Sequence, residues 1–219
     1  MAETSRPLPR SVWLGSSLAF GLIGLAVFVS LLQNSRSQKT PLPVIGQVAD
    51  FTLTNQDGKI TTLAEFTNHV WVADIIFTSC GGPCPRMTMQ MSSLQKKLPA
   101  DSRARLVTLT TFPEFDTPEL LKKYGTHYGA DFSRWTFLTG AKTEIAKLAA
   151  GDLKLASQPV KPEEQQNPAD LFIHSTYFVV VDKRAQLRAV FETGGEGVDW
   201  TNAVLPKIIS TVRQLENEP

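Results

Sequence analysis

Cysteine and histidine are scarce in this chain of 219 residues, which contains two cysteines and three histidines. Two sulfurs cannot complete a stable metal site alone, so such a site needs a further donor, and the histidines are the natural candidates. Long runs of one charge are also missing, and the formal net charge is +1. This balance gives no electrostatic footprint for nucleic acid, which we therefore do not expect as a partner.

The composition that is present, 42% apolar and 20% charged, is typical of one globular domain with an appendage. The appendage is the segment 12–32, which has 21 residues and no charged side chain. As a helix it would span about 30 Å, the hydrocarbon thickness of a bilayer. We therefore expect an N-terminal tail at 1–11, a transmembrane anchor at 12–32, a linker at 33–44 and a folded domain at 45–219.

A cleaved signal peptide is the alternative to the anchor, but it would have a shorter apolar segment and a cleavage site of small residues. Residues 33–36, QNSR, are polar and bulky and supply no such site. Two basic residues precede the segment and two follow it, so the positive-inside rule does not decide its orientation. The preference of short N-terminal tails for the cytoplasm favours a single-pass protein whose domain lies outside.

Both cysteines lie four positions apart in the segment 78–85, TSCGGPCP. The apolar run 70–77 predicts a buried strand and the pattern after the cysteines predicts a helix, so the pair lies at a strand-to-helix turn. A structural disulfide is the simplest interpretation, but it would close a loop of only three intervening residues and constrain the unfolded chain weakly. The helix start favours thiolate, which is a nucleophile and a soft metal ligand. Redox or metal chemistry explains the spacing better.

Hydrophobic periodicity predicts an α/β domain with a central mixed sheet flanked by helices. An Asp-Gly turn at 57–58 predicts a hairpin over 51–63. Met87 and Met91 share a helical stripe with Leu94 and Leu98, which favours core packing over copper binding. A long loop is expected at 158–170. Further strands are expected at 70–77, 105–110, 135–138, 176–181 and 187–191, and helices at 85–98, 118–128 with Asp116 or Thr117 as cap, 141–150 closed by Gly151, and 199–214.

The three histidines differ in their expected positions. His69 precedes the strand that leads to the cysteines, so it should lie at the opposite end of that strand, roughly 30 Å away. His127 falls late in a helix, where a histidine commonly offsets the C-terminal dipole. His174 lies between the long loop and a buried strand, and a strand end there can face the cysteine turn. Lone histidines usually serve structure, but the cysteine pair makes His174 the candidate ligand.

Five blocks follow one another along the chain: FTSCGGPCP at 77–85, DTPELLKKY at 116–124, WTFLTG at 135–140, HS at 174–175 and YFVVVD at 177–182. In this order they resemble the Sco/SenC family over about residues 45–192. The resemblance implies a thioredoxin-like fold, one N-terminal helix that tethers the domain to the bacterial cytoplasmic membrane on its periplasmic side, and copper binding for assembly of the CuA centre of cytochrome c oxidase. It also implies that Cys80, Cys84 and His174 are copper ligands. Two thiolates and an imidazole suit Cu(I), and can hold Cu(II) with a weak further ligand.

The resemblance thus implies a membrane-tethered copper metallochaperone with a redox-active dithiol formed by Cys80 and Cys84. Its partners would be a respiratory oxidase subunit or another copper-receiving protein, and a thiol-disulfide reductant. One departure is Phe112, which stands where the family has an acidic residue. Another is Gly82-Pro83-Cys84, which resembles thioredoxin.

These departures favour a second hypothesis, a membrane-anchored thiol-disulfide oxidoreductase that acts on an extracytoplasmic protein and needs no histidine. Against it, thioredoxins have a cis-proline before the strand that faces their active site, and residues 173–176, IHST, contain none. A third hypothesis is an assembly scaffold or redox sensor. Whether the chain is an enzyme stays open at this point.

Overall fold

A computed structural model describes residues 24–25, 41–155 and 176–218 of the chain. Apart from the helical Gly24 and Leu25, the expected anchor at 12–32 lies outside these residues, as does the loop at 158–170. No helix within the described ranges is long and apolar enough to cross a membrane. The chain divides into two units, Met1–Pro41 and Leu42–Pro219, and the account below concerns the second.

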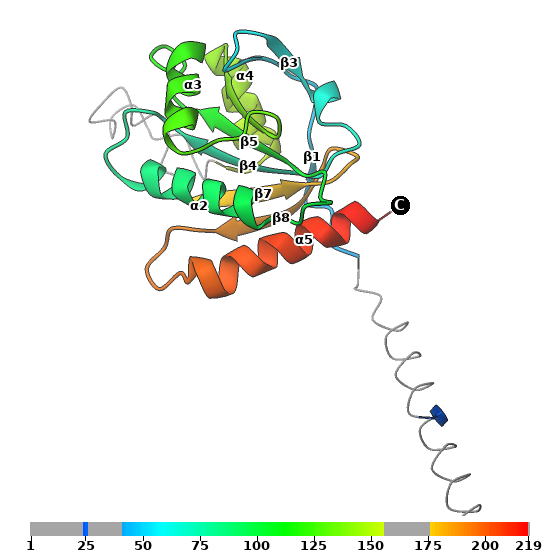
Figure 1. Cartoon of the computed structure of the whole chain (residues 1–219). Coiled ribbons are helices and arrows are strands. Elements are labelled where there is room, and N and C mark those ends of the chain that lie inside the picture. Colours follow the sequence, from blue (N-terminus) through cyan, green and yellow to red (C-terminus); the bar gives the residue numbers. More distant parts are fainter. Residues whose placement is uncertain (1–23, 26–40, 156–175, 219) are drawn as a thin grey trace, which may run out of the picture. The chain divides into compact units, whose positions relative to one another are not determined.

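The second unit is built on a mixed sheet, whose described part has eight strands in the order β1-β8-β7-β4-β5-β6-β2-β3. The central strand β4 pairs in parallel with β5 and antiparallel with β7, so the expected mixed sheet is confirmed (Figure 1). All six residues of β4 are buried, as is usual for a strand covered on both faces. The strands are β1 (Gly46–Gln47), β2 (Thr52–Asn55), β3 (Ile60–Thr62), β4 (Trp71–Ile76), β5 (Arg105–Thr110), β6 (Trp135–Thr139), β7 (Tyr177–Val181) and β8 (Gln186–Glu192).

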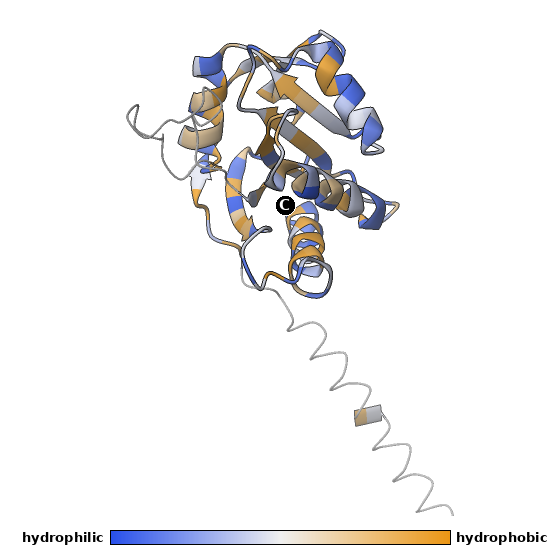
Figure 2. Cartoon of the chain, turned by 90° about the vertical axis from the view of Figure 1, so that its left-hand side faces the viewer, coloured by the Kyte–Doolittle hydropathy of each residue, from blue (hydrophilic) through white to orange (hydrophobic). Residues whose placement is uncertain are grey.

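Helices cover both faces of this sheet. Along β4, Val72 joins the apolar cluster under α2, α3 and α5, whereas Trp71 and Ala73 join the cluster under α4 and η2. This alternation follows from the two-residue period of a strand, and the interior strands are correspondingly hydrophobic (Figure 2). The helices are α2 (Pro83–Lys97), α3 (Pro118–His127), α4 (Lys142–Ala146) and α5 (Leu205–Asn217), together with the 3-10 turn η1 (Leu63–Glu65) and the π-helical turns η2 (Lys147–Asp152) and η4 (Trp200–Val204).

Two local predictions are confirmed in detail. The hairpin forms from β2 and β3, which pair antiparallel around Gly58, whose φ of 72° lies in the left-handed region that favours glycine. The methionine stripe of α2 is core, because Met87 and Met91 are 1% and 0% exposed and pack with Leu94 against the sheet. The interpretation of the stripe as core packing is therefore confirmed.

The prediction that Gly151 closes the fourth helix is wrong. The helix continues past it as the π-helical turn η2, and Leu153 donates its N–H to the carbonyl of Leu148 at 2.9 Å. Leu148, Ala149 and Leu153 are all buried in the core. Their packing keeps the chain winding, and it overrides the tendency of glycine to end a helix.

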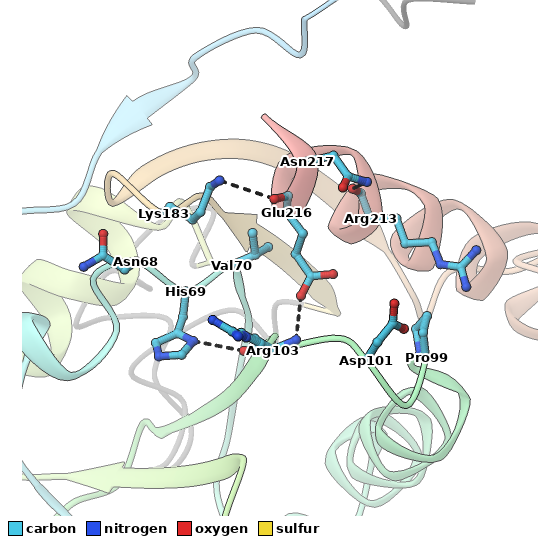
Figure 3. A pocket seen from close by; sticks show the side chains of 10 residues that line it. All are labelled: Asn68, His69, Val70, Pro99, Asp101, Arg103, Lys183, Arg213, Glu216 and Asn217. Atoms are coloured by element: carbon cyan, nitrogen blue, oxygen red, sulfur yellow. Dashed lines mark hydrogen bonds between the residues drawn. The ribbon is translucent and has the colours of Figure 1, made fainter. Parts of the chain in front are cut away.

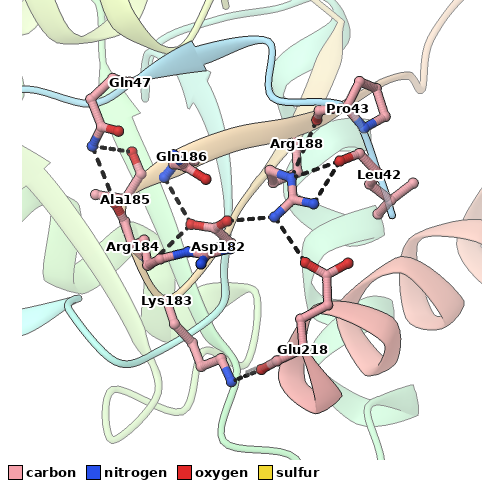
Figure 4. A network of polar contacts seen from close by, with 10 residues as sticks. All are labelled: Leu42, Pro43, Gln47, Asp182, Lys183, Arg184, Ala185, Gln186, Arg188 and Glu218. Atoms are coloured by element: carbon pink, nitrogen blue, oxygen red, sulfur yellow. Dashed lines mark hydrogen bonds and ion pairs between the residues drawn. The ribbon is translucent and has the colours of Figure 1, made fainter. Parts of the chain in front are cut away.

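A buried arginine joins the beginning of the unit to its end (Figure 4). The Arg188 guanidinium contacts Asp182 at 2.6 Å and Glu218 at 2.9 Å, and it donates to the carbonyl of Leu42 at 2.6 Å. The side chains of Arg188 and Asp182 are only 3% and 4% exposed. Leu42, at the start of the unit, is therefore held to β8 and to the C-terminal end of α5 through one cation.

Replacing Arg188 with methionine should destabilise the domain by about 3 to 5 kcal/mol, because the Asp182 charge would stay buried without its partner. Urea unfolding followed by circular dichroism measures this loss. Lys122→Met is the matched control, since Lys122 and Asp57 form an exposed pair that should contribute about 1 kcal/mol or less. Equal losses in the two variants would contradict the structural role assigned to Arg188.

Candidate functional site

The cysteine turn follows β4 at the carboxyl end of that strand. The chain leaves β4 at Ile76 and turns through a hydrogen bond of 3.2 Å from the Cys80 N–H to the Phe77 carbonyl. Helix α2 then begins at Pro83, a residue that suits a first helical position because it has no N–H to satisfy. Cys84 is the second residue of α2, so the two sulfurs flank the helix start as predicted.

Both cysteines are buried in this turn, whereas residues 79, 81 and 82 of the same turn are exposed. Cys80 is 8% exposed and Cys84 is 3% exposed, and both are free thiols. They pack with Ile76, Phe77 and Tyr124. The Gly82 N–H donates to the Cys80 sulfur at 3.4 Å. The site is therefore a pair of soft donors packed among apolar side chains beneath the turn.

The expectation that the helix start favours thiolate is wrong for Cys84. Burial raises the pKa of this thiol well above its ordinary value, and its contacts with Cys80 raise it further. The backbone of Phe77 acts in the opposite direction but does not compensate. A low-dielectric environment disfavours the anion more than the helix terminus favours it. Cys84 is thus a thiol at neutral pH, and a bound cation would be needed to hold it as thiolate.

A buried carboxylate secures the turn from the side of β5. Asp116 is 0% exposed and accepts hydrogen bonds from the Thr78 N–H at 3.2 Å, from the Thr78 hydroxyl and from the Thr110 hydroxyl. The sequence allowed Asp116 or Thr117 as the cap of α3, and the cap is Thr117, which accepts from the Leu120 N–H at 3.3 Å. Because the threonine fills the cap, the aspartate is left to hold the cysteine turn.

The other side of α2 is tied to the end of β8. Arg86 donates to the Gly194 carbonyl at 2.8 Å, and Gln90 donates to the Thr193 carbonyl at 2.9 Å. Thr193 in turn donates its N–H to the carbonyl of Thr176 at 2.7 Å. Thr176 precedes β7, which runs antiparallel to β4 and so begins at the end of the sheet where the cysteine turn lies.

Of the three histidines, His174 lies outside the described residues, so its position relative to the sulfurs stays a prediction. His69 lies at the opposite end of β4, as expected, and its Nδ1 faces the Arg103 carbonyl at 3.1 Å. It lines a polar pocket of about 620 Å³ with Arg103, Lys183 and Glu216 (Figure 3).

His127 is the last residue of α3, and its ring packs edge-on against Tyr128. Its place in the last helical turn agrees with the expected interaction with the helix dipole. Within the described ranges, no group of three or more histidine, cysteine, aspartate or glutamate side chains is arranged to hold a metal ion.

The segment between β5 and α3 carries one departure noted in the sequence. Phe112 stands after β5 and stacks on Phe115 with ring centroids 5.8 Å apart, and the Phe115 side chain is 50% exposed. The ring of Phe112, stacked on Phe115, therefore occupies the position where the resemblance implied an acidic residue.

Comparison with known proteins decides the family. The SCO1/SenC family profile matches residues 43–207, which include the whole sheet and both cysteines. The chain belongs to the SCO1/SenC family. The SCO1 protein homolog of Bacillus subtilis is 40% identical over 141 residues, which cover 64% of this chain and 70% of that protein.

Solved structures of Sco proteins share the fold. The structure of BsSco, described as a member of the Sco family of cytochrome c oxidase assembly proteins with a disulfide switch, is 35% identical with a TM-score of 0.67 and covers 83% of this chain and 100% of that one. A SCO1/SenC family lipoprotein of Bacillus anthracis is 29% identical with a TM-score of 0.64, covering 79% and 96%. The expected thioredoxin-like α/β fold is confirmed by these likenesses.

A more distant structure, ScoI of Bradyrhizobium japonicum, has copper bound. It is 18% identical with a TM-score of 0.60 and covers 77% of this chain and 99% of that one. At this identity the likeness extends to the fold alone.

Proposed function

We propose that this protein is a copper metallochaperone of respiratory oxidase assembly, which holds its cargo with Cys80, Cys84 and His174. The observation that carries the proposal is the pair of adjacent free thiols under the β4–α2 turn of a SCO1/SenC chain. Sulfur is a soft ligand that selects Cu(I) over harder cations. The two cysteines are surrounded by apolar side chains, which supply no competing hard ligand.

The third ligand is supported by the path of the chain. Thr176 is bonded to Thr193, which is linked to α2 through Gln90. His174 precedes Thr176 by two residues, and two extended residues span about 7 Å. Because β7 begins at the end of the sheet where β4 leads into the cysteine turn, this spacing favours an approach of the imidazole to the sulfurs. A neutral imidazole would complete a three-coordinate site without adding charge.

The chemistry of loading follows from the two thiols. A disulfide between Cys80 and Cys84 would take up two electrons and two protons from a thiol-disulfide reductant to give the dithiol, which can then bind Cu(I). Delivery would pass the ion to a respiratory oxidase subunit at its CuA centre or to another copper-receiving protein. In this proposal the segment 12–32 tethers the domain to the cytoplasmic membrane of a bacterium, on the periplasmic side.

A thiol-disulfide oxidoreductase is the second candidate. The observation in its favour is that the Cys80 side chain is close enough to influence the pKa of Cys84. The two sulfurs of a redox pair must lie close together to form a disulfide. In such a reaction one thiolate attacks a target disulfide and the other resolves the mixed disulfide. Neither step needs His174.

Copper titration of the reduced full chain in detergent separates the two candidates. We expect one Cu(I) per chain, and we expect His174→Ala to weaken its binding by more than about 10-fold. His127→Ala is the control, because His127 lies at the end of α3. If His174→Ala binds copper as tightly as the unchanged chain, the three-ligand site is wrong. Reduction of a protein disulfide at a rate that ignores both copper and His174 would support the oxidoreductase.

A further inference from the structure

A carboxyl group lies buried in the middle of β4, below the cysteine site. Asp74 is 0% exposed. By the alternation of the strand it lies on the same face as Val72 and Ile76. Val72 belongs to the core under α2, and Ile76 packs with both sulfurs. The carboxyl group therefore occupies the floor of the site, one strand repeat below the residue that contacts the cysteines.

Few polar groups surround this carboxyl. Its Oδ1 accepts from the Thr108 hydroxyl at 2.6 Å, and that hydroxyl accepts from the Trp135 indole N–H at 2.9 Å. Its Oδ2 has no hydrogen-bond partner in the described part of the chain. A buried carboxylate with an unpartnered oxygen is costly, whereas the protonated acid is much less so.

The electrostatics agree with this geometry. Burial raises the pKa of Asp74 to about 7, against the opposing effects of the hydrogen bond from Thr108 and of its own backbone. No cation is among the influences on this pKa. Two other titratable groups respond to its charge. They are Cys84 on α2 and Tyr124 on α3, whose pKa values are raised first by burial and also by the Asp74 carboxylate.

We propose that Asp74 takes up a proton when the cysteine pair binds Cu(I), so that the buried site never holds two negative charges. The proposal rests on the copper binding proposed above. Two thiols and one carboxylate react with Cu(I) to give a copper dithiolate of charge −1, a carboxylic acid and one proton released to solvent. No electron moves. A neutral His174 ligand leaves this count unchanged.

The driving force is repulsion between like charges in a low dielectric. A copper dithiolate next to an ionised carboxylate would place two anions in an apolar site, and each would disfavour the other. Protonation of Asp74 removes one of them. By linkage, copper raises the pKa of Asp74 as much as the ionised Asp74 weakens copper binding. Release of copper to a partner then returns the proton.

Proton counting during Cu(I) binding tests the inference on the full chain in detergent. At about pH 8 the unchanged protein should release one proton per copper and Asp74→Asn should release two, whereas at about pH 6 both should release two. Between the pKa of Asp74 in the dithiol protein and its higher pKa with copper bound, the copper affinity of the Asn variant should therefore gain about tenfold per pH unit over that of the unchanged chain. Asp57→Asn, at an exposed carboxyl on the hairpin, should behave as the unchanged chain.

A second readout needs no binding constant. The carboxyl carbon signal of Asp74, identified by its loss in the Asn variant, should titrate near the pKa of about 7 in the dithiol protein. With Cu(I) bound it should titrate at least about two pH units higher, since the site has become anionic and must keep Asp74 protonated at about pH 8. Equal proton release at both pH values, or an unchanged titration of this signal, would overturn the inference.

Thr108→Val keeps the test decisive if the Asn variant does not fold. Loss of the Thr108 hydrogen bond should raise the pKa of Asp74. The pH at which the number of protons released per copper falls from two to one should then be higher than in the unchanged chain. If this pH is the same in Thr108→Val and in the unchanged chain, the inference is wrong. Ag(I) serves as a separate probe, because a dithiolate binds this soft monovalent ion with the same net charge. If Ag(I) binds with the expected proton difference but Cu(I) does not bind, the proposed function is wrong. If both ions bind and neither shows the proton difference between Asp74→Asn and the unchanged chain, the role of Asp74 is wrong.

Discussion

Cys84→Ser is expected to remove tight Cu(I) binding, with a loss of affinity of more than about 100-fold, the upper end of what outer-shell changes cost. The hydroxyl oxygen of serine is a hard donor that is not ionised at neutral pH, whereas Cu(I) selects soft thiolate. Cys84 is 3% exposed, so water cannot readily replace the missing sulfur. Competition against a chromophoric Cu(I) chelator measures the change.

The matched control is Met87→Leu, on the same helix one turn further along. Met87 is also a buried sulfur, but it packs in the core, so a leucine of similar volume should cost less than about 1.5 kcal/mol of stability. Its copper affinity should stay that of the unchanged chain. If Cys84→Ser retains full affinity while Met87→Leu loses it, the ligands come from the methionine stripe, and the assignment of the dithiol is wrong.

Much of this fold follows from local pattern. Strand β4 is predictable because its whole length is apolar apart from one residue, and α3 because Thr117 and Pro118 suit a cap and a first helical position. The position of the cysteine turn is predictable for the same reason, because it lies between a strand and a helix that the sequence pattern predicts. Asp74 is the exception within β4. In the sequence it only interrupts the apolar run, and nothing there indicates its position below the cysteines.

What sequence patterns missed depends on contacts between distant segments. The charge preference of a helix start is local, but the burial that opposes it at Cys84 comes from Tyr124 and from strand β4. Gly151 has a local preference to end a helix, which the core around Leu148 overrides. Asp116 and Thr117 are both suitable caps for α3 in the sequence. The role of Asp116 becomes clear only from the structure, where it accepts a hydrogen bond from the distant Thr78.

Asp116→Ala is expected to destabilise the domain by about 3 kcal/mol, which corresponds to a fall in Tm of roughly 10 °C. The change leaves the Thr78 N–H and two threonine hydroxyls without their acceptor, and Thr110 is 0% exposed. Thermal unfolding by circular dichroism measures the loss. Glu114→Ala is the control, since Glu114 lies two residues earlier and forms an exposed ion pair with Lys142, where the effect should stay within about 1 kcal/mol.

Copper affinity tells whether Asp116 acts only on the fold. Asp116 holds Thr78, which lies two residues before Cys80, so its loss frees the turn that positions one sulfur against the other. At a temperature where the variant is still folded, we expect Cu(I) to bind at least about 10-fold more weakly, in the range measured for groups that orient metal ligands. Asp116→Asn keeps one acceptor oxygen and should lose less affinity than alanine. A folded alanine variant with undiminished affinity would mean that the turn holds its shape without this carboxylate.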